Sequence, residues 1–165
     1  MKELLIQYAA YNVWANKNIT NVVLSLSEAQ QFQILESSFP TLYATIMHMW
    51  VAESVWWQRV SSEEKIIIPG EENNPTMQEA VKGLVQQSAH WEEWVREASE
   101  MMLHHMYAYQ NSKREQFRQP VAETLMHVFN HSTYHRGQLV TMLRTLGVKV
   151  IPSTDFSVFV RKKKS

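Results

Sequence analysis

Four long segments of the chain repeat apolar residues at spacings of three and four positions, with polar stretches between them. This spacing is the period of an amphipathic α-helix that has one apolar face. The segments cover about residues 3–26, 39–60, 76–103 and 120–147. Because each helix has to bury its apolar face against the others, the pattern predicts an all-α four-helix bundle in a single domain, residues 1–165.

Residues at the segment boundaries are typical of helix ends. Ser27 with Gln30, and Thr76 with Glu79, have the spacing of a capping box, which predicts a short helical turn after residue 27 and the start of the third helix. Gly147 suits the position just past the end of the fourth helix. We expect residues 107–119 to be a connection and residues 148–165 to be a short C-terminal remainder.

The composition excludes several classes of function. The chain has no cysteine, so it has no disulfides, no thiolate metal site and no cysteine nucleophile. Sixteen Lys and Arg balance sixteen Asp and Glu, so no overall charge attracts nucleic acid or an anionic membrane. The chain has neither an apolar run of about 18 residues nor a signal peptide. We therefore expect a cytoplasmic protein with no nucleic-acid or membrane partner.

Three histidines of the fourth segment share one side of the predicted helix. His127, His131 and His135 follow one another at intervals of four residues, and each such step turns only about 40° around the helix. Histidines at this spacing can present ring nitrogens to one divalent ion. A third ligand would come from another helix, and the candidates are His48 and His90. Spacing alone does not choose between them. The competing interpretation is that these are core histidines, each satisfied by a single hydrogen bond.

Other helical metal sites do not fit the sequence. A di-iron bundle needs Glu-x-x-His on two helices, and a zincin needs His-Glu-x-x-His; both patterns are absent. Glu53 lies five residues after His48, about 140° around the helix, which makes it a poor general base for a site at His48.

Three parts of the chain resemble the DinB-like (damage-inducible) family of the DinB/YfiT-like superfamily. Residues 125–138 read LMHVFNHSTYHRGQ, which is similar to the family signature of a histidine, three residues, and then His-Arg-Gly-Gln. Residues 47–57, MHMWVAESVWW, resemble the family's helix with one histidine before an aromatic-rich turn, and residues 11–16, YNVWAN, resemble its first-helix motif.

The resemblance implies an up-down-down-up four-helix bundle, a homodimer and three histidines that hold a divalent metal. Carried onto this sequence, the ligands are His48, His131 and His135. His127 would then line the pocket or support the ligands. Arg136 belongs to the same motif but is turned about 100° from His135, so we expect it to bond a neighbouring helix or a partner chain.

Three neutral imidazoles leave a divalent ion with its full charge and an open position, as in catalytic zinc sites. Zn, Ni, Fe and Mn all suit such ligands, and we expect zinc or nickel first. The family resemblance implies transfer of a low-molecular-weight thiol, such as bacillithiol, mycothiol or glutathione, to an electrophilic small molecule. Alternatives are a metal-dependent hydrolase and a non-catalytic metal- or ligand-binding dimer of a stress response. Ordinary imidazoles protonate near pH 6, where we expect the ion to leave.

Overall fold

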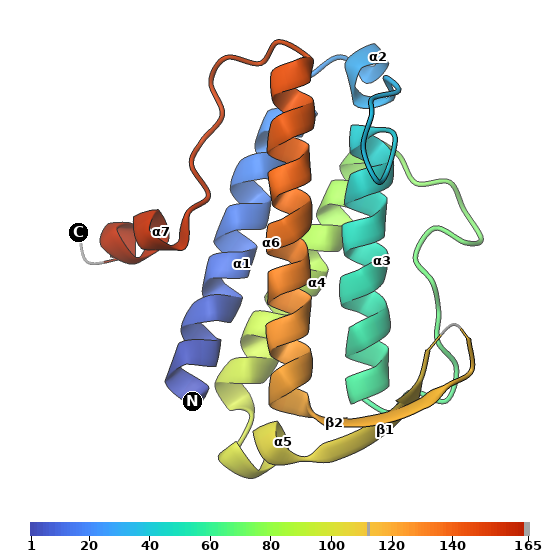
Figure 1. The fold of residues 1–165 in the computed structure, drawn as a ribbon, viewed down its shortest axis with the longest axis vertical. Helices are drawn as coiled ribbons and strands as arrows, with labels where there is room; N and C mark the ends of the chain where they lie inside the picture. Colours follow the sequence, from blue (N-terminus) through green and yellow to red (C-terminus); the bar gives the residue numbers. More distant parts are fainter. Residues whose placement is uncertain (112, 164–165) are drawn as a thin grey trace.

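The computed structural model describes residues 1–111 and 113–163. Within them, four long helices lie side by side (Figure 1). They are α1 (Lys2–Leu24), α3 (Leu42–Val60), α4 (Met77–Glu97) and α6 (Val121–Thr145). The shorter elements are α2 (Glu28–Gln31), α5 (Glu100–His104), β1 (Met106–Gln110), β2 (Gln116–Pro120) and α7 (Phe156–Lys163).

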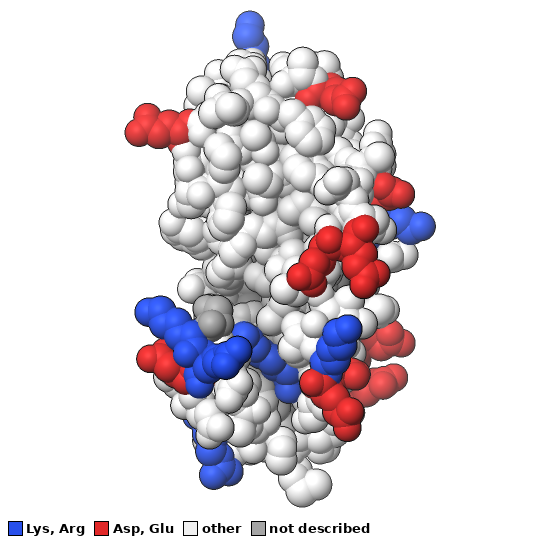
Figure 2. Space-filling model, turned by 90° about the vertical axis from the view of Figure 1, so that its right-hand side faces the viewer, with Lys and Arg blue, Asp and Glu red and all other residues white. Residues whose placement is uncertain are grey.

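The long helices form a closed ring in cross-section. α1 contacts α4 and α6, and α3 contacts the same two helices. In the view of Figure 1, α1 and α6 run upward while α3 and α4 run downward. Among the described residues, no helix combines the length and the apolar character needed to cross a membrane. Figure 2 looks onto the side of α3 and the β-strands, where basic side chains gather low on the face with acidic ones among and above them.

The helix starts follow the capping patterns of the sequence. The hydroxyl of Ser27 accepts from the backbone N–H of Gln30, and the hydroxyl of Thr76 accepts from the backbone N–H of Glu79. In both capping boxes the side chain of the second residue in turn accepts from the backbone N–H of the first. Thr41 caps α3 in the same way, through the N–H of Ala44 at 2.9 Å. These bonds satisfy backbone donors that the first helical turn leaves without partners.

The core consists of two apolar clusters at opposite ends of the bundle. The hairpin-end cluster includes Leu5, Trp91, Leu125 and Phe129. The loop-end cluster is built from residues of all four long helices. Its members include Ile19, Met49, Leu84 and Leu139. Between the clusters, each long helix contributes buried polar side chains, so the apolar faces that the sequence predicts are interrupted at one level.

One close contact between α3 and α4 requires a glycine. The indole ring of Trp50 packs directly on Gly83, and a β-carbon at that position would overlap the ring. Gly83 therefore lets α4 approach α3 closely, at the cost of about 0.5–1 kcal/mol that a helical glycine carries relative to alanine.

The third predicted helix is divided in two. α4 ends at Glu97, because Ala98 leaves the helical conformation with ψ at 132°. Ser99 then caps α5 by accepting from the N–H of Met102 at 3.1 Å. The predicted helix to residue 103 was thus wrong at its end. A local capping bond competes there with continuation of the helix.

The predicted connection 107–119 is a β-hairpin. β1 and β2 pair antiparallel, with Tyr107 opposite Gln119 and Tyr109 opposite Phe117. The side chain of Asn111 accepts from the backbone N–H groups of Lys113 and Glu115, and Arg114 has a φ of 62°. This asparagine-based turn joins the strands across the end of the bundle.

The C-terminal remainder also contains a helix that the sequence pattern did not predict. Phe156 and Phe159 of α7 contact the ring of Tyr11 at 5.1 and 5.9 Å between centroids. The hydroxyl of Tyr11 donates to the carbonyl of Thr154 at 2.7 Å. Aromatic contacts with α1 thus hold a helix too short to be stable alone.

Candidate metal centre

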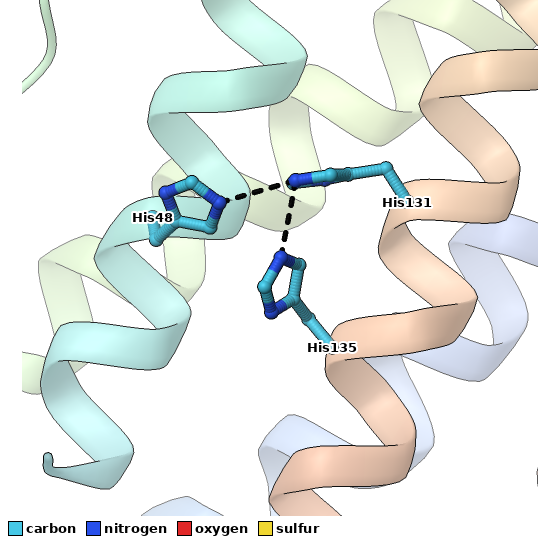
Figure 3. A group of neighbouring side chains, drawn as sticks. All are labelled: His48, His131 and His135. Atoms are coloured by element: carbon cyan, nitrogen blue, oxygen red, sulfur yellow. Dashed lines mark hydrogen bonds between the residues drawn. The ribbon is translucent and has the colours of Figure 1, made fainter. Parts of the chain in front are cut away.

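Three histidine side chains from α3 and α6 point toward one another (Figure 3). Nε2 of His131 lies 3.1 Å from Nε2 of His48 and 3.1 Å from Nε2 of His135. One ligand atom from each of these residues lies within 4.8 Å of the others. His131 and His135 come from successive turns of α6, and His48 faces them from the adjacent α3. The structure therefore brings together the three residues expected as ligands.

The spacing of the nitrogens fits a shared divalent ion. Nitrogens at about 2.0–2.1 Å from a tetrahedral zinc ion lie about 3.3 Å from one another. The two observed separations of 3.1 Å are close to this value. A single ring nitrogen of His131 faces two others, and it cannot donate to both or accept well from both. A cation between the three lone pairs satisfies all of them at once.

A hydrogen-bond chain selects the nitrogen that His135 presents. The amide of Gln138 donates from Nε2 to the hydroxyl of Ser38 at 2.9 Å. Its Oε1 therefore faces Nδ1 of His135 at 2.7 Å and requires a proton on that nitrogen. The lone pair of the imidazole is then on Nε2, toward the other two rings. Metal-binding histidines usually have such a partner on the second ring nitrogen.

The histidines are held in the neutral form that metal binding requires. Burial, with a contribution from the charge of His135, lowers the pKa of His48 to about 4. Burial and the neighbouring histidine charges likewise lower the pKa of His131 to about 4. Burial also lowers the pKa of His135, which is only 3% exposed. At neutral pH the cluster therefore offers uncharged imidazoles.

Aromatic side chains cover the histidines on two sides. Phe39, in the loop before α3, stacks on the ring of His48 with 4.1 Å between centroids. On the hairpin side, the centroid of the His127 ring lies 5.8 Å from that of His131 and 5.1 Å from that of Trp56. His127 thus lines the surroundings of the triad without joining it.

The remaining histidines lie elsewhere. His90, the alternative third ligand, contacts Trp57 at 6.1 Å between ring centroids and lines a separate cavity of about 260 Å³ on α4. Nε2 of His104 lies 3.8 Å from a carboxylate oxygen of Glu100. In the described part of the chain, no other set of three or more His, Asp or Glu side chains lies close enough together to share an ion.

Comparison with known proteins assigns the chain to a family. The model of the DinB family matches residues 1–163. The chain belongs to the DinB family. It is 27% identical over 179 residues to Protein DinB of Bacillus subtilis (strain 168), with 97% of this chain and 95% of that protein covered.

A solved structure shows the same DinB-like fold. The crystal structure of a DinB-like protein from Bacillus cereus ATCC 10987 matches with a TM-score of 0.68. The match covers 92% of this chain and 95% of that chain, at 17% sequence identity. The mostly helical DinB-like fold is therefore shown by both sequence and structure.

A buried polar layer lies in the core of this DinB-family chain, and one of its members, Ser132, follows His131 on α6. Its centre is the carboxylate of Glu53, which is 1% exposed. The other members are Asn12, Asn16, Ser88, Ser132 and Arg136. Oε1 of Glu53 accepts from Asn12 at 2.9 Å, Asn16 at 3.2 Å and Ser132 at 2.8 Å. Four helices therefore meet at one carboxylate.

Two asparagine amides connect Glu53 to a buried cation. Nη1 of Arg136 donates to Oδ1 of Asn12 at 2.7 Å and to Oδ1 of Asn16 at 2.8 Å. The expectation that Arg136 bonds a neighbouring helix is confirmed. Burial raises the pKa of Glu53, while its hydrogen bonds and the charge of Arg136 oppose that shift. The amides therefore link the carboxyl group of Glu53 to the guanidinium of Arg136.

Sequence reasoning missed this layer and the partners of the triad. Glu53 points into the core and not toward the histidines, so its dismissal as a general base agrees with the structure. Its role as the centre of the layer was not predicted. The available signal was that Asn12, Asn16 and Ser88 occupy the apolar stripes of their helices, where a polar side chain needs a buried partner.

Proposed function

We propose that the protein is a metal-dependent enzyme that holds one divalent ion on His48, His131 and His135. The observation that carries the proposal is the convergence of three Nε2 atoms in rings kept neutral by burial. Three protein ligands leave a position open, as in catalytic zinc sites. Zinc or nickel is the proposed ion, because imidazole ligands suit both.

The proposed reaction is transfer of a low-molecular-weight thiol to an electrophilic small molecule. The bound ion would supply a positive charge that stabilises the thiolate at neutral pH. The thiol would lose its proton to solvent water, its sulfur would form a bond to the electrophilic carbon, and the leaving group would depart with the electrons of the bond that breaks. Phe39, which stacks on His48, would provide an apolar contact and exclude water from the reacting atoms.

Hydrolysis is the alternative reaction at the same site. The histidine group contains no carboxylate, and Glu53 is turned away into the polar layer. A metal-bound water could attack as hydroxide in the same way as a thiol could attack as thiolate, because the ion would lower the pKa of either group. We prefer thiol transfer on the family resemblance alone. The other alternative is a non-catalytic metal- or ligand-binding dimer that acts in a stress response.

The proposal extends to the whole molecule. We propose an up-down-down-up four-helix bundle, supported by the helix directions in Figure 1. We also propose a cytoplasmic homodimer. Met1, Leu4 and Met126 are 70%, 59% and 47% exposed and line one apolar cavity of about 560 Å³, which supports an interface at that end of α1 and α6.

Metal analysis of purified variants tests the ligand set. His48→Ala, His131→Ala and His135→Ala should each lose the ion, whereas His90→Ala should retain it. His90→Ala is the matched control, because it removes an imidazole from a neighbouring helix outside the triad. Equal loss from His90→Ala, or full retention in His131→Ala, would contradict the assignment.

Cobalt substitution separates an enzyme from a binding protein. The spectrum of the Co²⁺-loaded protein should change when a small thiol is added, since a sulfur ligand brings charge-transfer bands. Turnover of a thiol and a generic electrophile should follow, and the His131→Ala protein should lack it. A spectrum that ignores every thiol would refute thiol transfer. A spectral change without turnover with any electrophile would favour the binding protein.

A further inference from the structure

A line of aromatic rings begins beside the histidine triad and ends at an arginine. We call it the aromatic strip, formed by His127, Trp56, Tyr109 and Arg59. The centroid of the Trp56 ring lies 5.1 Å from that of His127 and 4.9 Å from that of Tyr109. The guanidinium carbon of Arg59 lies 4.6 Å above the Trp56 ring and 5.2 Å from that of Tyr109. The triad and the strip are continuous, because His127 lies 5.8 Å from His131.

The strip extends from the triad toward the hairpin. Trp56 follows His48 by two helical turns on α3, and His127 precedes His131 by one turn on α6. α3 and α6 are in contact and run in opposite directions, so both steps lead toward the same end of the bundle. At about 1.5 Å per residue, Trp56 and the guanidinium stacked on it lie about 12 Å along the axis from His48.

Arg59 retains hydrogen-bonding capacity at the end of the strip. One of its N–H groups donates to the carbonyl of Gln110 at 3.0 Å, and a guanidinium has five such groups. Arg59 and Tyr109 line a cavity of about 370 Å³ between the end of α3 and β1. Glu63 lines the same cavity. Its carboxylate repels any anion, and the repulsion is smaller for a singly charged carboxylate than for a doubly charged phosphate. Of these two groups, a single carboxylate is therefore the better occupant beside Arg59.

We propose that the aromatic strip binds the body of the thiol substrate and that Arg59 recognises a carboxylate at its far end. This inference rests on the proposed function, because it assumes that the sulfur is held at the triad. It names the substrate class as thiols of about tripeptide length that carry a carboxylate. In glutathione the sulfur lies on the middle residue, and nine bonds separate it from an oxygen of the glutamyl α-carboxylate. Fully extended, nine bonds span at most about 10–11 Å, which is close to the separation of the triad and Arg59.

The test compares glutathione with glutathione diethyl ester, which has the same length and thiol but no free carboxylate. Binding to the Co²⁺-loaded protein is followed through the sulfur-to-cobalt bands. The wild-type protein should bind glutathione about tenfold more tightly than the ester, because a hydrogen bond to a charged group contributes on that scale. Arg59→Gln should remove this preference and leave the affinity for the ester unchanged.

Two further variants control for charge and for folding. Arg144→Gln removes the same charge from the exposed, opposite end of α6 and should keep the preference. Arg59→Lys keeps the positive charge and should retain part of the preference for glutathione over its ester. Thermal melts of each variant check that loss of the Gln110 bond has not loosened the hairpin.

The outcomes separate this inference from the proposed function. Equal binding of glutathione and its ester by the wild type, or a preference that survives in Arg59→Gln, would overturn the role of Arg59 while thiol binding stands. If neither thiol changes the cobalt spectrum, the proposed function fails, and the inference fails with it.

Discussion

Gln138 lies one turn after His135 on α6, and its amide connects that histidine to Ser38 of the loop before α3. Gln138→Leu removes the acceptor that keeps a proton on Nδ1 of His135, so the imidazole would populate the wrong tautomer as well. Loss of such a partner typically lowers metal affinity about 10–100-fold. Competition with a chelator of known affinity measures this. Gln78→Leu, at an exposed position of α4, is the control and should leave affinity unchanged.

The lowered pKa values of His48 and His131 predict a pH dependence with a definite sign. Both are about 4 in the folded protein, against an ordinary histidine value of 6.5. Between about pH 4 and pH 6.5, these histidines bind protons in the unfolded chain but not in the folded protein. Stability of the metal-free protein is therefore full above about pH 6.5 and falls as the pH drops toward 4.

Urea unfolding of the metal-free protein at pH 7, 5.5 and 4 measures this loss. A His48→Gln/His131→Gln double variant should show a flatter dependence over the same range. The same pKa values place proton competition with the metal well below pH 6, lower than an ordinary imidazole predicts. Release of the ion already complete at pH 6 would contradict the buried, neutral histidines.

The candidate ligand positions were partly predictable because helical geometry converts a spacing of four into a shared face. Spacing placed His127, His131 and His135 on one side of α6, but it did not select two of the three. It also did not choose between His48 and His90, because the rotation of α3 and α4 depends on packing between helices. The family resemblance made that choice. Gln138 and Ser38 are 100 positions apart, and no local pattern joins them. Their bond follows only from the folded arrangement.

At the scale of the helices, the polar layer connects all four long elements through buried groups. Arg136→Met would leave the carboxylate of Glu53 without its compensating charge. Removing one partner of a buried pair typically costs about 3–5 kcal/mol. We expect a loss of unfolding free energy in this range, measured by urea denaturation. Exposed Arg118→Met is the matched control and should change stability by less than about 0.5 kcal/mol.

A second substitution distinguishes charge compensation from packing. Adding Glu53→Gln to Arg136→Met removes the uncompensated charge, so the double variant should lose less stability than the two single losses combined. Strict additivity of the two losses would show that the asparagine amides do not couple the two charges.

The secondary elements outside the long helices were the least predictable. The two strands of the hairpin have five residues each, and their one buried side chain, Tyr107, bonds Thr124 on α6 at 2.6 Å. α7 depends in the same way on the rings of α1. In these elements the stabilising contacts come from distant parts of the chain. The long helices, in contrast, show their apolar period in the local sequence. Their predicted bounds differ little from those observed, except at the end of α4.

At the scale of the whole molecule, the exposed apolar residues around Leu4 and Met126 predict self-association. Leu4→Glu places a charge in the proposed interface, where it would have to lose its hydration. Equilibrium sedimentation at micromolar concentration should give twice 19.4 kDa for the wild type and 19.4 kDa for the variant. Gln7→Glu, which adds the same charge to the same helix outside that cavity, should remain a dimer. A monomeric wild type would end the proposal.

The division of the core into two clusters has a consequence for sequence change. The clusters share no residue, and the polar layer stands between them. A substitution that repacks one end therefore meets different neighbours from a substitution at the other end. The hairpin-end cluster packs against Trp56 and Tyr109 of the proposed strip, and the loop-end cluster does not. If the strip binds substrate, a change of substrate preference would be made at the hairpin end without altering the packing of the loop end.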